Sequence, residues 1–163
     1  MNPNNVANEL TAAESIHLRG NVRMQHDLGP QQVAQDLLIT QGGEMAELRC
    51  WVLAKLYWNP SLDAESLIDE FLDGYYGKAG RHVKAYLDVI HDASERTGET
   101  MGMLDPPTPE FLSFDVLSEG YRHLQRAEAV SENSDIRVRV QVAQMGVLYT
   151  CMVRWDELWL TAQ

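Results

Sequence analysis

Apolar residues recur at helical spacing through most of this chain from Gly42 onward. Residues 44–58 are apolar around nearly the whole circumference of a helix, which is typical of an element buried on several sides. Charge in this stretch is confined to Glu44, Glu47, Arg49 and Lys55. Asn59 and Pro60 should end the helix, because proline removes a hydrogen-bond donor and disfavours helical backbone in the residue before it.

Two amphipathic helices follow. Asp63 is in place to cap the first, in which apolar and acidic positions alternate at helical spacing. Its apolar residues are Leu67, Ile68, Phe71, Leu72 and Tyr75. We expect Gly74 and Gly77 to close this helix. The next helix should run from about residue 78 to 97 and end at Gly98, with one apolar face made of Val83, Leu87, Ile90 and Ala93.

The second half of the chain predicts two more helices. Ser113 is a suitable N-cap for a fourth helix, whose apolar residues include Val116 or Leu117, Tyr121 and Leu124. Residues 136–142 alternate as an exposed strand would, but a longer helical stripe overrides this pattern. The stripe consists of Ile136, Val140, Ala143, Val147, Cys151 and Trp155. It predicts one helix over 135–158, capped by Ser134 or Asp135.

Three regions have weaker patterns. Residues 5–18 are compatible with a short helix, and residues 37–39 fit either a strand or a turn of buried helix. The proline-rich stretch after Gly98 should be extended across a hydrophobic surface. The predicted fold is therefore all-α, a bundle of about five helices whose N-terminal 40 residues are partly irregular. We divide it into a poorly defined segment, 1–41, with at most one short helix, and a helical domain, 42–163.

The charge balance narrows the classes of partner. The chain has 13 basic and 24 acidic residues among 163, a formal net charge of −11, which disfavours nonspecific binding to nucleic acid or to an anionic membrane. No apolar stretch reaches the roughly 18 residues of a membrane span, and we expect no signal peptide within this chain. Cys50 and Cys151 both lie in apolar helical patterns, which favours buried free thiols over a disulfide.

The residues that could carry chemistry do not form a recognisable catalytic or metal-binding motif. The five histidines lack the spacing of a helical metal site, so we expect no metal and no cofactor. The acidic run from Asp63 to Asp73 could supply paired carboxylates, but its spacing favours a solvated helix face. Core packing is the usual role of aromatic residues at helical spacing. Trp58, Tyr75 and Tyr76 are the best candidates for contact with a sugar ring.

Three motifs at fixed intervals resemble those of a known family. The first is the run Glu44, Leu48, Arg49, Trp51, Leu53, Ala54, Lys55, Leu56, Trp58, Asn59 and Pro60. The others are Ile68-Asp69-Glu70-Phe71 and Tyr75-Tyr76-Gly77. Together they resemble the C-terminal helical part of the domain-of-unknown-function 4838 family, bacterial glycoside-hydrolase-like proteins similar in layout to α-glucuronidases and family 20 β-hexosaminidases. The resemblance is firm over about a third of the chain, is looser through the last two helices, and does not reach the residues before about Val33.

The resemblance implies a secreted or cell-surface system that degrades polysaccharides, in which this helical unit packs beside a catalytic barrel. A chain of 163 residues cannot hold a barrel of about 250 residues, and nothing before Gly42 supplies its strand-helix repeats. The expected function is therefore a non-catalytic accessory domain, and the alternative is a free-standing helical interaction module. Its partner would be the barrel or a second copy of the chain. The candidate contacts with carbohydrate or the barrel are Gln41, Glu44, Trp58, Tyr75 and Tyr76.

Overall fold

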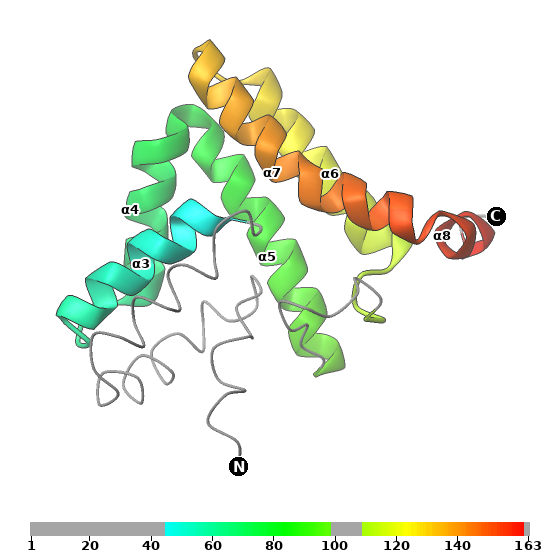
Figure 1. The fold of residues 1–163 in the computed structure, drawn as a ribbon, viewed down its shortest axis with the longest axis horizontal. Helices are drawn as coiled ribbons and strands as arrows, with labels where there is room; N and C mark the ends of the chain where they lie inside the picture. Colours follow the sequence, from blue (N-terminus) through cyan, green and yellow to red (C-terminus); the bar gives the residue numbers. More distant parts are fainter. Residues whose placement is uncertain (1–44, 99–108, 162–163) are drawn as a thin grey trace.

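The structure is a computed structural model that describes residues 45–98 and 109–161 (Figure 1). Within these ranges every regular element is helical, and five of the α-helices are 13 to 20 residues long. The all-α prediction of about five helices is thereby confirmed. The patterns predicted for residues 5–18 and 37–39 lie outside the described residues.

The first described helix, α3, spans Ala46–Trp58. It begins after Met45, whose backbone is left-handed (φ 50°), and ends at Asn59 as predicted. Burial falls mainly on one face, made of Leu48, Val52, Leu53 and Leu56. The expectation of burial on several sides was too strong, because several apolar side chains of the opposite face are half-buried and Trp58 is exposed.

Helix α4, Ala64–Tyr76, starts at the cap that the sequence predicts. The Asp63 carboxylate accepts a hydrogen bond from the Ser66 backbone N–H at 2.9 Å. Gly77 ends the helix with a positive φ of 53°, a conformation that glycine adopts without strain. Gly74 does not end it, because this residue lies inside the last helical turn.

A short 3₁₀ turn, η3 (Gly77–Ala79), separates α4 from α5, which spans Gly80–Thr97. The predicted helix start at residue 78 falls within this turn. Gly98 ends α5 in the left-handed region (φ 69°), as expected. The four apolar residues predicted to share one face of α5 are all buried: Val83, Leu87, Ile90 and Ala93.

Helix α6 spans Phe114–Ala129 and is capped by the Ser113 hydroxyl, which accepts a hydrogen bond from the Val116 N–H at 3.4 Å. The prolines at 106 and 107 lie outside the described residues. Just before α6, Phe111 and Leu112 are buried, which agrees with the expectation that this segment lies against a hydrophobic surface.

The single helix predicted over 135–158 is two helices, α7 (Ser134–Val153) and α8 (Trp155–Thr161). The cap is Asn133 rather than Ser134 or Asp135, since its side chain accepts from the Ile136 N–H at 2.9 Å. Arg154 occupies the break between the helices, and its guanidinium donates to the carbonyl of Leu112 at 2.7 Å. The alternation over 136–142 therefore belongs to a helix.

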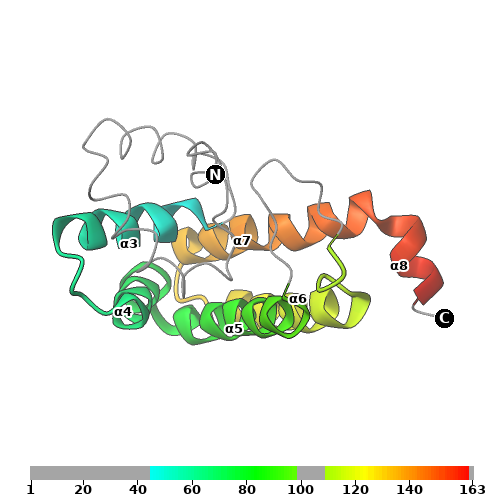
Figure 2. The same cartoon turned by 90° about the horizontal axis from the view of Figure 1, so that it is seen from below.

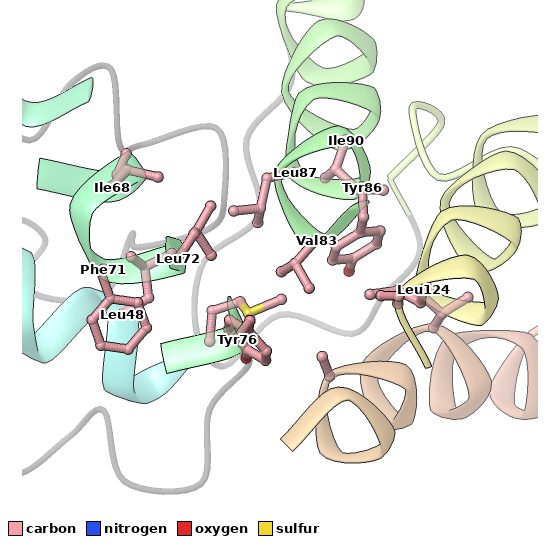
Figure 3. Packing of buried hydrophobic residues seen from close by; sticks show 14 of the residues in the cluster. Leu48, Ile68, Phe71, Leu72, Tyr76, Val83, Tyr86, Leu87, Ile90 and Leu124 are labelled. Carbon is pink, nitrogen blue, oxygen red and sulfur yellow. Dashed lines mark hydrogen bonds between the residues drawn. The ribbon is translucent and has the colours of Figure 1, made fainter. Parts of the chain in front are cut away.

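The helices form two layers (Figure 2). Helices α3 and α7 lie on one side, α4, α5 and α6 on the other, and α8 turns away from the axis of α7. The core lies where α4, α5 and α6 meet the inner faces of α3 and α7, as Figure 3 shows for Leu72, Val83 and Leu124. Among the described helices, α4, α5 and α6 therefore contact only the inner faces of α3 and α7.

Candidate functional site

The five predicted contact residues do not form one site in the part of the chain that is described. Gln41 and Glu44 lie outside it. Trp58 ends α3 and is 91% exposed, whereas Tyr76 is only 4% exposed and belongs to the core. Tyr75 and Tyr76 stand at the far end of α4 from Trp58, about 16 Å along the helix from Ala64 at 1.5 Å per residue. Trp58 and Tyr75 therefore cannot stack on the same sugar ring, and contact by either with a ligand stays a prediction.

Tyr75 belongs to a row of aromatic rings between α3 and α4. Ring centroids of Trp51 and Phe71 are 5.7 Å apart, and those of Phe71 and Tyr75 are stacked at 4.8 Å. A cation lies over the ring at each end of this aromatic row. Lys55 Nζ is 4.8 Å from the centroid of the Trp51 ring, and the Arg139 guanidinium carbon is 4.1 Å from that of Tyr75. Cations over ring faces are attracted by the ring quadrupole. Because both Phe71 and Arg139 lie over the Tyr75 ring, a sugar would have to displace one of them to stack there.

Tyr76, the next residue along α4, is buried in the core. The Tyr76 hydroxyl lies 3.7 Å from the Met45 sulfur, to which it donates, and burial raises the pKa of Tyr76 above its ordinary value of 10. Arg139 also donates to the Tyr75 carbonyl at 2.7 Å, which ties α7 to the end of α4. The described contacts of the Tyr75-Tyr76-Gly77 motif are thus with other parts of the same chain.

The acidic run on α4 has the solvated character that its spacing predicted. All five carboxylates are exposed: Asp63, Glu65, Asp69, Glu70 and Asp73. Asp63 serves as the helix cap and Glu65 pairs with Lys84 on α5. Exposed carboxylates along one helix surface do not form the enclosed pair that glycoside hydrolysis uses.

The thiols and histidines of the described residues also lack a catalytic arrangement. Cys50 and Cys151 are both half-buried and are not joined in a disulfide, and burial raises the pKa of Cys151, which disfavours its thiolate. Burial likewise lowers the pKa of His82 and His91. In residues 45–98 and 109–161, no three histidine, cysteine or acidic side chains are grouped to hold a metal ion.

A shallow hollow lies between α5 and α6. It is lined by Val89, Asp92, Glu95, Arg96, Val116 and Glu119. Arg96 donates to the carbonyl of Asp92 on its own helix at 3.2 Å, so its guanidinium is partly engaged locally. Exposed carboxylates around an open hollow on two helix surfaces do not define a catalytic pair.

The most unusual surface is the outer face of α7 and α8. Helix α7 places five apolar residues on one face at intervals of four, three, four and three, and all are 55–69% exposed. We call these residues the α7 seam: Val138, Val142, Met145, Tyr149 and Met152. Leu148 and Val153 flank the seam, and α8 adds Trp155, Trp159 and Leu160, all of them exposed. Single exposed apolar residues are ordinary, but a contiguous apolar face of this length marks an interaction surface.

The seam lies opposite the face that packs in the core. At about 100° per residue, its members fall within one half of the helix, whereas the buried residues Val140, Ala143 and Val147 fall in the other half. The buried stripe was predicted from the sequence, whereas the exposed seam was not. The seam could have been recognised by its alternating intervals of four and three residues. Its residues, however, interleave in the sequence with those of the stripe assigned to the core.

These features define the class of protein as an all-α bundle with an apolar outer face on α7–α8 and an exposed tryptophan, Trp58, at the end of α3. Residues 5–88, just over half of the chain, match the family model described as Domain of unknown function (DUF4838), and the chain belongs to this family. No curated protein and no solved structure matches the chain. Within the described residues, no helix is long and apolar enough to cross a membrane.

The family match has bounds that differ from the motif resemblance. It begins at residue 5, well before the residues that carry recognisable motifs, and ends at residue 88 within α5. Helices α3 and α4 lie inside the match, whereas α6, α7 and α8 lie beyond it. The α7 seam is thus outside the part of the chain that the family model covers.

Proposed function

We propose that this chain is a non-catalytic helical accessory domain of a glycoside-hydrolase-like protein, and that it packs against a catalytic barrel supplied from elsewhere. The motif resemblance of α3 and α4 motivates the proposal. The observation that carries it is Trp58, which ends α3 and is 91% exposed, whereas Trp51 on the same helix packs against Phe71 of α4. Trp51 is half-buried, while Ala54 and Trp58 are exposed.

An exposed tryptophan at the end of an apolar helix is typical of a residue that is buried in an assembly. Tryptophan is enriched among the residues that dominate binding energy, because it buries a large area at low entropic cost. Trp58 meets this description, and it belongs to the motif that resembles the barrel-containing family. Packing of the end of α3 against a barrel would bury the Trp58 side chain.

The test measures binding of the purified chain to a separately produced barrel domain from a full-length member of the family. Trp58→Ala should weaken binding at least tenfold, the low end for loss of a central aromatic residue. Trp159→Ala on α8 is the matched control, since it removes another exposed tryptophan and should leave binding unchanged. Absence of binding, or a loss with Trp159→Ala alone, would contradict the proposal.

The non-catalytic part of the proposal has its own assay. The purified chain should not hydrolyse aryl glycosides, including glucuronides and N-acetylhexosaminides. Hydrolysis that disappears on substitution of one carboxylate, such as Asp69→Asn, would make the chain an enzyme and refute this part. The acidic face of α4 is the appropriate place for such a substitution because it holds the densest group of carboxylates.

A second function, that of a protein-interaction module, is favoured by a different observation. The α7 seam and α8 present apolar surface on helices that lie beyond the family match and are separate from α3. Such a module would be active without any barrel.

A further inference from the structure

We propose that the α7 seam is a self-association surface through which two copies of this chain pair with their α7 helices side by side. The proposal concerns residues outside the family match and does not depend on the existence of a barrel. Three properties of the seam support it: its spacing, its area and the distribution of charge around it.

The spacing of the seam matches what a second identical helix requires. Intervals of four and three residues average 3.5, the repeat with which two α-helices keep one apolar stripe in contact along their length. The seam is also nearly symmetric about Met145, since Val138 and Met152 each lie seven residues from it. An antiparallel pair with Met145 at the two-fold axis therefore places each end of the seam against the other end in the second copy.

The area of the seam is close to what a stable dimer needs. Seven side chains, the seam with Leu148 and Val153, are 47–69% exposed. Large apolar side chains expose about 150–200 Å² when free, so these seven present roughly 600–800 Å². A standard interface buries about 800 Å² on each partner. Trp155, Trp159 and Leu160 on α8 supply further apolar area at the end of the seam.

The distribution of charge also favours the α7 seam as the contact surface. Two copies with a formal net charge of −11 repel each other, so an acidic surface cannot be the contact. Between Val140 and Val153 there is no Asp, Glu, Lys or Arg, which makes this stretch of α7 free of charge that pairing would have to desolvate. Salt screens the remaining repulsion. Dimerisation through the seam should therefore tighten as sodium chloride is raised, whereas pairing through ion pairs would weaken.

The first experiment is analytical ultracentrifugation of the purified chain over a range of concentration and salt. The expected result is a monomer–dimer equilibrium with a micromolar or tighter dissociation constant, tighter at high salt. Met145→Glu should weaken pairing about a hundredfold or more, because the two-fold axis brings two carboxylates together in an apolar contact. Ala54→Glu on α3 adds the same charge at an exposed helical position and should leave pairing unchanged.

The second experiment places the contact directly. In a Cys50→Ser, Cys151→Ser background, Met145→Cys should form a disulfide-linked dimer under mild oxidation, whereas Ala54→Cys should not. A chain that stays monomeric overturns the proposal, and so does a dimer that Met145→Glu leaves intact. A monomer that instead co-floats with phosphatidylcholine vesicles through the seam also overturns it. Circular dichroism of each variant establishes that an altered assembly state does not result from unfolding.

Discussion

Gly80 marks the closest approach between two consecutive helices of the family-matched region. It is the first residue of α5, and a Cβ added there would lie 2.6 Å from the carbonyl oxygen and 2.9 Å from the carbonyl carbon of Leu72. Both atoms belong to the backbone of α4, which cannot rotate away as a side chain could. Gly80→Ala should therefore push α5 away from the end of α4.

Gly74 provides the matched comparison. It lies inside α4 with nothing within 4 Å of an added Cβ. Alanine there gains about 0.5–1 kcal/mol, because glycine costs that much in a helix interior. At Gly80, overpacking typically costs about 1–3 kcal/mol, against which a helical φ of −51° allows alanine a propensity gain of up to about 1 kcal/mol. We expect a net loss of about 1–2 kcal/mol for Gly80→Ala and a gain for Gly74→Ala.

Urea unfolding followed by far-ultraviolet circular dichroism measures both free energies of unfolding at one protein concentration. In thermal melts of a chain of this length, a change of 1 kcal/mol in the free energy of unfolding shifts Tm by about 2–4 °C. The Tm values of the two variants should therefore differ by several degrees. Equal or increased stability of Gly80→Ala would refute the contact between the two helix ends. A destabilised Gly74→Ala would show that this residue packs against something other than solvent.

Two further perturbations test buried polar groups. Arg154→Met should reduce the free energy of unfolding by about 1.5–3 kcal/mol, because it removes a charged hydrogen bond to the buried carbonyl of Leu112. Glu157→Gln, at the exposed ion-pair partner of Arg154, should cost less. Equal losses of stability in the two variants would contradict this. Burial lowers the pKa of His91 below its ordinary value of 6.5, so the unfolded chain binds the proton more readily and stability should fall as pH drops below about 6.5. His91→Gln should reduce that fall between pH 7.5 and 5.5 in thermal melts, and an unchanged pH dependence would argue against burial of the ring.

Several helix starts and ends could be predicted from local capping residues, although Gly74 does not end α4 and Asn133 caps α7 in place of Ser134 or Asp135. Asp63, Ser113 and Gly98 each perform the capping role expected of them, because capping depends on residues within one turn. The break at Arg154 escaped prediction for the opposite reason. No proline or glycine marks it, and the contact of Arg154 with Leu112 joins residues far apart in the sequence.

The candidate contact residues illustrate what proximity in sequence leaves open. Trp58 and Tyr75 lie only 17 residues apart in the sequence, yet α4 holds them at opposite ends of a hairpin. Tyr75 and Tyr76 are adjacent in sequence but differ in exposure, because successive residues of a helix point about 100° apart. Tyr76, one of the candidates for contact with a sugar, is therefore packed in the core, and the role of Trp58 remains to be tested.

The exposed seam of helix α7 was not predicted from the sequence. Both of its faces carry apolar residues, so periodicity alone could not decide which one packs in the core. The buried face also contains Gln144, Thr150 and the neighbouring Arg154, whereas the exposed seam consists entirely of valine, methionine and tyrosine. Gln144 is accommodated because its amide donates to the Glu128 carboxylate at 2.9 Å. A helix that buries hydrogen-bonded polar groups and exposes its more apolar face is explained if the exposed face has a partner of its own. The proposed self-association of α7 would supply that partner.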